Sequence, residues 1–528
     1  MSQNIGKQFI NGQRIAANAA EIESINATDY QANGYVFSQA TLDEVNQAAQ
    51  AAHDAFVVYS QTTSNDRAAF LEEIATQIEA IGPSLQEVAS LETGLPLGRL
   101  QGETGRVTSQ LRLFAEVVRR GDFYAARIDP ALPDRKPMPR VDLRQMRIAI
   151  GPVAVFGASN FPLAFSTAGG DTVSALAAGC PVVFKAHSGH MATAELVAQA
   201  IEKAVQICNM PSGTFNMIFG SRVGADLVEH PLIKAVGFTG SLDGGMALYN
   251  LAQQRPQPIP LFAEMSSVNP LVVLPEALAV RGQQIAADTV ASFNMGCGQF
   301  CTKPGLILGI KSPEFDQFIA VLKESTSSSI PQVMLNAGTL KSYKAGIADL
   351  ENETGFDKIA EGQASTLVSQ ATAQLFQADQ SVLLAGSAKL QHEVFGPMSI
   401  VVAVDDKATL IQGIEKLAGQ LTATIIGEDT DFAHSHDLLN LLSQKAGRVL
   451  FNGFPTGVEV SDAMVHGGPF PATTDTRGTS VGTAAIDRFL RPVCYQNTPQ
   501  SLLPAALKDE NPLGINRLIN GQVTQQAL

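Results

Sequence analysis

Residues 152–190, which read PVAVFGASNFPLAFSTAGGDTVSALAAGCPVVFKAHSGH, contain the alternation that decides the fold. Two apolar runs, 153–156 and 182–184, flank an Ala-rich stretch of helix-forming composition at 172–178. Continuous apolar strands that alternate with helices are typical of a parallel sheet with both faces covered. This stretch therefore predicts an α/β fold.

The same alternation extends in the C-terminal direction. Apolar runs at 215–219 and 235–238 follow helical stretches at 192–206 and 224–229. Further apolar runs continue to about residue 475, which predicts a second α/β unit. Ligands of such sheets bind at the carboxyl ends of the strands.

Toward the N-terminus, residues 41–92 read as helices, one of which is expected to end at Gly82-Pro83. A further amphipathic helix is expected over 105–120. An alternating run at 141–150 predicts a half-exposed strand.

Composition limits the class of protein. The 528 residues exceed a single domain of roughly 100–200 residues, so we expect two or three domains. A formal net charge of -14 argues against a nucleic-acid surface, which needs clustered basic groups. Five cysteines do not make a disulfide scaffold, and neither a signal peptide nor a membrane span is visible. We therefore expect a cytoplasmic protein without membrane contact.

The stretch GCGQFCTKP, residues 296–304, is the strongest chemical signal. A cysteine thiolate is a natural nucleophile for a carbonyl carbon, and neighbouring glycines allow close approach of a substrate. Cys297 and Cys301, four residues apart, are also a candidate metal pair. Zinc needs about four ligands, however, and no second Cys or His pair has suitable spacing, so we expect no metal site.

Glu264 stands between apolar residues in the segment FAEMSSVNP, residues 262–270. Burial of a carboxylate is costly, and desolvation is expected to raise its pKa and make it a usable general base. The alternative is a solvated Glu on a surface loop.

Three further polar groups follow predicted strands. Asn160 is placed to stabilise an oxyanion, with a plain turn as the alternative. Lys185 ends the next strand, where it can reach a ribose hydroxyl or a phosphate. Gly240 and Ser241 form a small turn before a helix, which is a ready anion site although it is not the usual dinucleotide fingerprint.

Taken together, these residues resemble the aldehyde dehydrogenase superfamily over nearly the whole chain. Each motif alone is weak, but their order and spacing are specific. The motifs are ETGLP (92–96), ASNFP (158–162), FKAH (184–187), FTGS (238–241), the Glu264 segment, GQFCTKP (298–304), EVFGP (393–397) and GGPFPATTD (467–475).

The resemblance implies an aldehyde dehydrogenase fold with a Rossmann-like cofactor domain, an α/β catalytic domain and a small bridging sheet whose strands pair across the subunits of a homodimer or homotetramer. The implied boundaries are 1–124 and 150–266 for the cofactor domain, 267–475 for the catalytic domain, 125–149 and 476–500 for the bridging strands, and 501–528 for a tail without an assigned role.

The resemblance also implies roles for individual residues. Cys301 is the nucleophile, Asn160 and the Cys301 backbone N–H form the oxyanion hole, and Glu264 activates the hydrolytic water. The implied cofactor-binding residues are Lys185, Ser188, Arg222, Gly240, Ser241, Glu393 and Phe395. Candidate substrate contacts are Arg106, Gln110, Phe165 and Phe454, with ordinary solvated helix charge as the alternative for the first two.

Two departures from the superfamily pattern matter. Many NAD-preferring members carry a Glu three residues after the cofactor Lys, and here Ser188 takes that position. A hydroxyl accepts a 2′-phosphate that a carboxylate would repel, and Arg222 can supply charge, so we expect NADP to be preferred, with NAD also usable. The usual Arg-Glu-Leu-Gly is replaced by residues 477–480, Arg-Gly-Thr-Ser, which puts a proton relay through that Glu in doubt.

Within the superfamily, long stretches such as GVEVSDAMVHGGP are most similar to the bacterial α-ketoglutaric semialdehyde dehydrogenases, which implies a small aldehyde substrate and 2-oxoglutarate as product. The bacterial NADP-dependent fatty aldehyde dehydrogenases are the next resemblance. A non-catalytic structural or binding member and an acyl transferase to coenzyme A are further alternatives. Retention of Cys301, Glu264 and Asn160 favours a hydrolytic enzyme.

Overall fold

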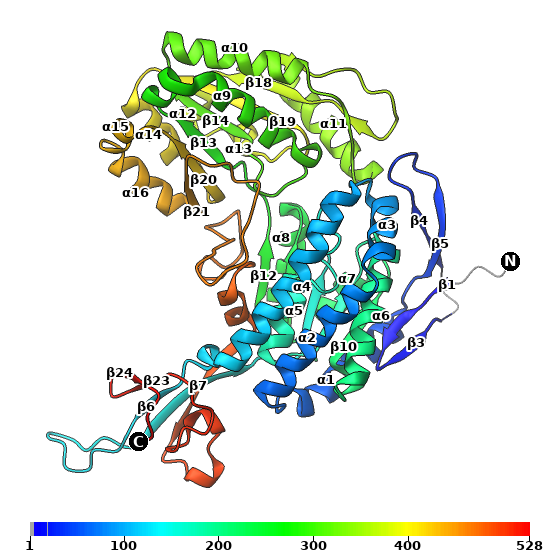
Figure 1. Ribbon diagram of the computed structural model, residues 1–528, viewed down its shortest axis with the longest axis vertical. Coiled ribbons are helices and arrows are strands. Elements are labelled where there is room, and N and C mark those ends of the chain that lie inside the picture. Colours follow the sequence, from blue (N-terminus) through cyan, green and yellow to red (C-terminus); the bar gives the residue numbers. More distant parts are fainter. Residues whose placement is uncertain (1–4, 18–19) are drawn as a thin grey trace.

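The computed structural model describes residues 5–17 and 20–528 (Figure 1). Residues 1–4, which begin the N-terminal stretch considered above for a signal peptide, and residues 18–19 lie outside the described part. Within the described ranges, we find no helix with the length and hydropathy that a membrane span requires.

The first seven-stranded sheet contains the strands of residues 152–190, the stretch that predicts the α/β fold. Its strand order is β12-β11-β8-β9-β10-β2-β3, and β8 to β12 are parallel. The bounds are β2 (Gln8–Ile10), β3 (Gln13–Ile15), β8 (Val153–Phe156), β9 (Val182–Lys185), β10 (Phe215–Ile218), β11 (Ala235–Thr239) and β12 (Leu261–Glu264). The chain order reverses between β8 and β11, and such a switch point opens a ligand crevice at the carboxyl ends of the strands.

Helices cover both faces of this sheet. The connecting helices are α5 (Gly170–Ala178), α6 (Met191–Ile207), α7 (Val223–Glu229) and α8 (Leu242–Gln254). The N-terminal helices are α1 (Leu42–Tyr59), α2 (Ser64–Ala80), α3 (Gly82–Thr93) and α4 (Leu97–Arg120). The apolar faces of α2, α3 and α4 join α5, α6 and the sheet in one core, with Phe70 and Leu111 fully buried, whereas α1 packs mainly with α7 and α8 in a second core. The predicted α/β alternation is confirmed.

The predicted helix end at Gly82-Pro83 is confirmed, since α2 ends at Ala80. Helix α3 follows directly within the range 41–92 that was read as helical, because Pro83 fits a first helical turn, where no N–H partner is needed. One helix boundary differs from the sequence prediction. Helix α4 begins at Leu97, eight residues before the expected start at 105. Its N-terminal part contains three glycines, which lower helix propensity, and burial against neighbouring elements outweighs that cost.

The second seven-stranded sheet has the order β16-β18-β19-β14-β13-β20-β21, in which β16 is antiparallel to β18. Its strands are β13 (Pro270–Val273), β14 (Leu306–Ile310), β16 (Phe356–Glu361), β18 (Gln374–Ala378), β19 (Met398–Val404), β20 (Gln420–Ile426) and β21 (Ala446–Phe451). The helices α9 (Pro275–Asn294) and α10 (Pro313–Ser327) cover one face, and α11 (Ala337–Glu351), α14 (Lys407–Glu415) and α16 (His436–Lys445) cover the other.

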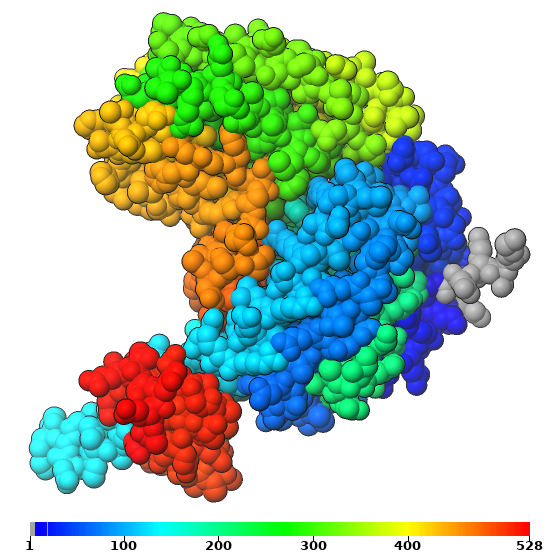
Figure 2. All heavy atoms as spheres, in the orientation of Figure 1, coloured from blue at the N-terminus to red at the C-terminus, as the bar shows by residue number. Residues whose placement is uncertain are grey.

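A third sheet, β22-β7-β6-β23-β24, projects away from the two larger units (Figure 2). Its strands are β6 (Arg127–Asp129), β7 (Leu143–Ala149), β22 (Leu490–Gln496), β23 (Arg517–Ile519) and β24 (Gln522–Thr524). The C-terminal tail, whose role the sequence left open, thus supplies two of the five strands. The buried Arg517 side chain stabilises this tail by donating to the Gln526 carbonyl at 2.8 Å.

Candidate active site

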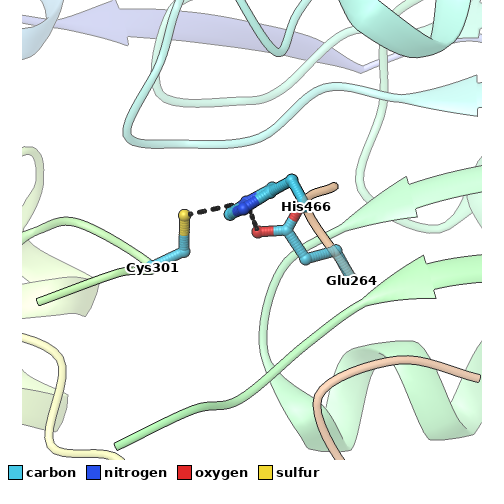
Figure 3. A group of neighbouring side chains, drawn as sticks. All are labelled: Glu264, Cys301 and His466. Carbon is cyan, nitrogen blue, oxygen red and sulfur yellow. Dashed lines mark hydrogen bonds and ion pairs between the residues drawn. The ribbon is translucent and has the colours of Figure 1, made fainter. Parts of the chain in front are cut away.

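Three side chains from distant parts of the sequence meet between the two larger units (Figure 3). Nε2 of His466 lies 2.8 Å from Oε1 of Glu264 and 3.5 Å from Sγ of Cys301. Glu264 ends β12, Cys301 lies in the loop before β14, and His466 lies in the long segment after β21. Glu264 and His466 are 3% and 1% exposed, whereas Cys301 is half-buried and reachable by a ligand.

The loop that carries Cys301 is tightly held. After α9, the three residues from Gly296 to Gly298 all have positive φ. A Cβ at Gly298 would lie 2.2 Å from the Gly396 carbonyl oxygen, so glycine is required where this loop meets the EVFGP loop. Nδ2 of Asn269 donates to the Cys301 carbonyl at 2.8 Å. The nucleophile candidate is therefore fixed beside the residues that the resemblance assigns to the cofactor.

The two cysteines of this loop differ in their surroundings. Burial, with the charge and hydrogen bond of Glu264, holds the pKa of the Cys301 thiol well above its usual range. The thiol is thus protonated near neutrality and needs a proton acceptor before it can attack. Burial raises the pKa of Cys297 to about 12, and its Sγ contacts the Gln332 carbonyl at 3.3 Å. Cys297 is therefore part of the packing.

The protonation state of Glu264 differs from the sequence expectation. Burial does act to raise its pKa, but the charge and hydrogen bond of His466 act in the other direction. Hydrogen bonds from Ser480, at 2.8 Å, and from Cys301 add to the lowering. The net result is a pKa below the ordinary value, so the expected rise is wrong. Glu264 is a buried but ionised carboxylate, able to accept a proton.

His466 is not among the residues predicted from the sequence. Its position directly before the GGPFPATTD motif is the sequence signal that points to it, and 202 residues separate it from Glu264. The segment lies along β12, since the Thr474 N–H donates to the Ala263 carbonyl at 3.1 Å. The Ser480 N–H donates to the His466 carbonyl at 2.8 Å. This contact holds the His466 and Ser480 side chains within hydrogen-bond distance of the Glu264 carboxylate.

Asn160 lies directly against the Cys301 loop. The residue is 7% exposed, and its Nδ2 donates to the Gln299 carbonyl at 3.0 Å, which leaves one amide N–H for another acceptor. Nη2 of Arg99, on α4, donates to the Asn160 carbonyl at 2.8 Å and holds the loop. Within the described part of the chain, the Cys301 backbone N–H has no hydrogen-bond partner. Two N–H donors are therefore available in and beside the Cys301 loop.

A cavity of about 20 Å³ lies beside Glu264 and His466. One water molecule needs roughly 10–15 Å³ of such volume, so the cavity has room for one. It adjoins a larger cavity of about 900 Å³, and both are lined by Phe262, Asp475, Gly478, Thr479 and Arg488. Gly478, which stands where many superfamily members have Glu, thus borders a possible water route to the carboxylate.

The residues assigned to a dinucleotide by resemblance cluster at the crevice predicted by the strand order. Gly240 and Ser241 are exposed between β11 and α8, and the Ser241 hydroxyl caps that helix. Burial lowers the pKa of Lys185, at the end of β9, to about 8, and burial raises that of Glu393 to about 7. Among the described residues the Lys185 ammonium has no hydrogen-bond or ion-pair partner, as expected of a group that binds a ligand.

Three remaining cofactor candidates lie farther out. Ser188 and Arg222 are exposed on the loops that follow the neighbouring strands β9 and β10. Because these strands are parallel, both loops lie at the same edge of the sheet. Phe395 is half-buried beside Gly396, in the loop that contacts Gly298. These positions fit a dinucleotide that runs from the edge of β10 toward Cys301.

Arg106 is the most informative of the candidate substrate contacts. Its guanidinium lies 5.5 Å from the Phe165 ring, and that ring lies 6.2 Å from His466. Nε and Nη2 of Arg106 are buried without a hydrogen-bond partner in the described part of the chain. Leaving such charged donors unpaired is costly, which indicates that a ligand acceptor completes the site.

The other two substrate candidates have different surroundings. Gln110 is buried, with its Nε2 beside Gly170 at the start of α5. Phe454 is half-buried and packs against the apolar core on the α9 face of the second sheet. Within the described part of the chain, neither side chain makes a hydrogen bond or a ring contact with Arg106.

Comparison with known proteins agrees with this geometry. The chain is 76% identical over 525 residues to the α-ketoglutaric semialdehyde dehydrogenase of Acinetobacter baylyi, covering 99% of this chain and 100% of that protein. It is 50% identical over 523 residues to α-ketoglutaric semialdehyde dehydrogenase 2 of Azospirillum brasilense, covering 98% and 99%.

Solved structures share the fold. Aldehyde dehydrogenase C from Pseudomonas syringae, determined with NAD+ and octanal, superposes with a TM-score of 0.79 at 19% identity, covering 94% of this chain and 97% of that one. The aldehyde dehydrogenase family, whose members use NAD or NADP, matches residues 15–490. By its sequence, its strand order and its Cys301 site, the chain belongs to the aldehyde dehydrogenase family.

Proposed function

We propose that this protein oxidises α-ketoglutaric semialdehyde (2,5-dioxopentanoate) to 2-oxoglutarate, with NADP as the preferred acceptor. The observation that carries the proposal is that Nε and Nη2 of the Arg106 guanidinium, beside the Cys301 cluster, are buried without a partner among the described residues. A short aldehyde with a carboxylate at its other end supplies an electrophile for Cys301 and an acceptor for Arg106. The names of the two relatives at 76% and 50% identity support this substrate.

In the first chemical step, the Cys301 sulfur attacks the aldehyde carbon. Glu264, which is ionised and accepts a hydrogen bond from the Cys301 thiol, takes the thiol proton, so the attacking species is the thiolate. The Asn160 amide and the Cys301 backbone N–H stabilise the resulting oxyanion. The product of this step is a thiohemiacetal on Cys301.

The second stage converts the thiohemiacetal into acid. A bound nicotinamide supplies the acceptor for the hydride lost from the substrate carbon. Glu264, once it has released the thiol proton to solvent, takes a proton from a water molecule in the adjoining cavity of about 20 Å³, and the hydroxide attacks the Cys301 thioester. Release of the carboxylic acid restores the thiol. Splitting the oxidation in two lowers the barrier of each part.

For the cofactor, we propose that Lys185 and Glu393 bind the ribose hydroxyls and that the N-terminus of α8, at Ser241, binds the pyrophosphate. Ser188 and Arg222 accommodate the 2′-phosphate that distinguishes NADP. The preference is tested by steady-state kinetics of the purified enzyme. A higher kcat/KM for NADP than for NAD supports it, and the reverse order overturns it.

We also propose that β7 and β22 form an oligomerisation sheet in a dimer or tetramer. β22 is an edge strand of the third sheet, and an edge offers unpaired backbone groups to a second copy. The predicted boundaries of the cofactor, catalytic and bridging domains, and a cytoplasmic location compatible with five free cysteines, remain part of this proposal. Light scattering tests the assembly: a dimer or tetramer supports it, and a monomer contradicts it.

A long-chain aliphatic aldehyde is the second candidate substrate. Phe161, Phe165 and Phe300 form an aromatic group beside the site, with ring centroids 5.3 Å apart in both pairs, and this surface favours an apolar chain.

NADPH formation with three aldehydes separates the candidates. The purified enzyme is assayed with α-ketoglutaric semialdehyde, succinate semialdehyde and a long-chain aldehyde, with Cys301→Ala as the blank. A higher kcat/KM for α-ketoglutaric semialdehyde supports the proposal. A higher value for the long-chain aldehyde would select the second candidate, and no activity above the blank would indicate a non-catalytic member.

A further inference from the structure

Cys301, His466 and Glu264 present three different donor atoms toward one point. Sγ, Nε2 and a carboxylate oxygen all lie within 4.8 Å of one another (Figure 3). Thiolate, imidazole and carboxylate are the ligands that zinc prefers in proteins. The spacing of residues along the sequence gave no indication of a metal site, because the three ligands come from separate segments.

We propose that these three side chains bind a zinc ion, which inhibits the enzyme by occupying its nucleophile and its base. The fourth coordination position is left for water. This binding does not depend on the identity of the aldehyde or on the cofactor preference proposed above.

The distances fit a tetrahedral ion. With bonds of about 2.3 Å to sulfur and about 2.0–2.1 Å to nitrogen and oxygen, tetrahedral ligands are roughly 3.6 Å apart for S and N and roughly 3.3 Å apart for N and O. The observed separations are 3.5 Å between Sγ and Nε2 and 2.8 Å between Nε2 and Oε1. The first separation fits, the second must open by roughly half an ångström, and Sγ lies within 4.8 Å of the carboxylate oxygen.

The ligands are oriented before an ion arrives. Ser480 donates to Oε2 of Glu264 at 2.8 Å, which leaves Oε1 directed at His466. Asn269 anchors the Cys301 carbonyl at 2.8 Å. Such outer contacts raise metal affinity by reducing the reorganisation needed on binding. Nδ1 of His466, in contrast, is buried without a partner in the described part of the chain, which makes the site weaker than a dedicated structural zinc site.

The charges and protons balance on binding. On binding, the Cys301 thiol loses its proton to solvent, and the charged His466 imidazole loses the proton on Nε2, which leaves a neutral imidazole protonated on Nδ1. The ion, one thiolate and one carboxylate then sum to zero charge, which suits a mostly buried site. Because protons are released, the apparent affinity rises with pH.

The test uses the full-length protein without cofactor or aldehyde. Zn²⁺ is titrated in competition with a metallochromic indicator, and Co²⁺ is titrated while the near-ultraviolet absorbance is recorded. We expect one ion per chain and a thiolate-to-cobalt charge-transfer band. Both are expected to disappear in Cys301→Ser and His466→Ala, and to persist in Cys297→Ser and Cys494→Ser, which change cysteines outside the cluster.

Two further measurements keep the test decisive if a variant misfolds. Ser480→Ala retains all three ligands and is expected to bind zinc about 10–100-fold more weakly. In the wild type, zinc is expected to protect Cys301, identified by mass spectrometry, from iodoacetamide. The proposal is overturned by a stoichiometry near zero, by a cobalt band that survives Cys301→Ser, or by alkylation of Cys301 at an unchanged rate in saturating zinc.

Discussion

Nε2 of His466 lies 2.8 Å from Oε1 of Glu264, across 202 residues of sequence. This hydrogen bond, together with the charge of the imidazole, overcomes the effect of burial and keeps the carboxylate ionised. A carboxylate as buried as Glu264 and without such partners would be held neutral. His466 therefore sets the protonation state of the proposed base.

Replacement of His466 is expected to change the pH dependence of the reaction. In His466→Leu, burial is opposed mainly by Ser480, so the pKa of Glu264 rises. The ionised form exists above that pKa, and the acid limb of the kcat profile should move to higher pH. Ser480→Ala should move it in the same direction by a smaller amount. An unshifted acid limb in both variants would contradict this role.

Asn160→Ala should lower kcat by about 10²–10³-fold, because one oxyanion donor is lost. The iodoacetamide labelling rate of Cys301 and the thermal unfolding midpoint serve as controls, since Asn160 also holds the Gln299 carbonyl. A kcat close to that of the wild type, with the fold intact, would exclude Asn160 from the oxyanion site.

Arg106→Ala should raise KM for α-ketoglutaric semialdehyde by roughly 10–100-fold, because a charged hydrogen bond contributes about 1.5–3 kcal/mol. A straight-chain aldehyde without a carboxylate is the matched control and should keep its KM. Arg106→Lys should restore part of the affinity, since it keeps the charge but not the planar donor pair. Equal changes in KM with both aldehydes would mean that Arg106 acts on the packing around the site and not on the substrate carboxylate.

Ser188→Glu should reverse the cofactor preference. The added carboxylate repels the 2′-phosphate of NADP and accepts a hydrogen bond from the ribose hydroxyl of NAD. The measured quantity is the ratio of kcat/KM for the two cofactors, with Ser188→Gln as the uncharged control. Retention of the wild-type ratio in Ser188→Glu would show that this loop does not contact the adenosine ribose.

Gly478→Val should slow hydrolysis of the thioester without slowing its formation. A Cβ at Gly478 meets its nearest neighbour, Cγ of Arg488, at 3.5 Å, so the change is tolerated while the side chain fills the cavity of about 20 Å³. Rapid-mixing kinetics should show a burst of NADPH followed by a slower steady state. Gly478→Ala is the smaller control, and loss of the burst itself would point to a different cause.

The α/β architecture followed from local patterns. The apolar runs 153–156 and 235–238 match β8 and the first part of β11, because parallel strands buried on both faces need continuous apolar sequence. Helix boundaries that are set by packing could not be predicted from local patterns. Helix α4 begins at Leu97 because burial of its face outweighs the propensity cost of its glycines.

By itself, the sequence determined the alternation of strands and helices, the family resemblance and the identity of Cys301, Glu264 and Asn160 as candidates, because each of these is encoded in a contiguous motif. Tertiary structure alone decided that His466 joins Cys301 to Glu264, that Glu264 is ionised, and that two buried nitrogens of Arg106 lack a partner within the described part of the chain. These properties depend on contacts between segments far apart in the chain and on the balance of burial against charge, which no local pattern contains.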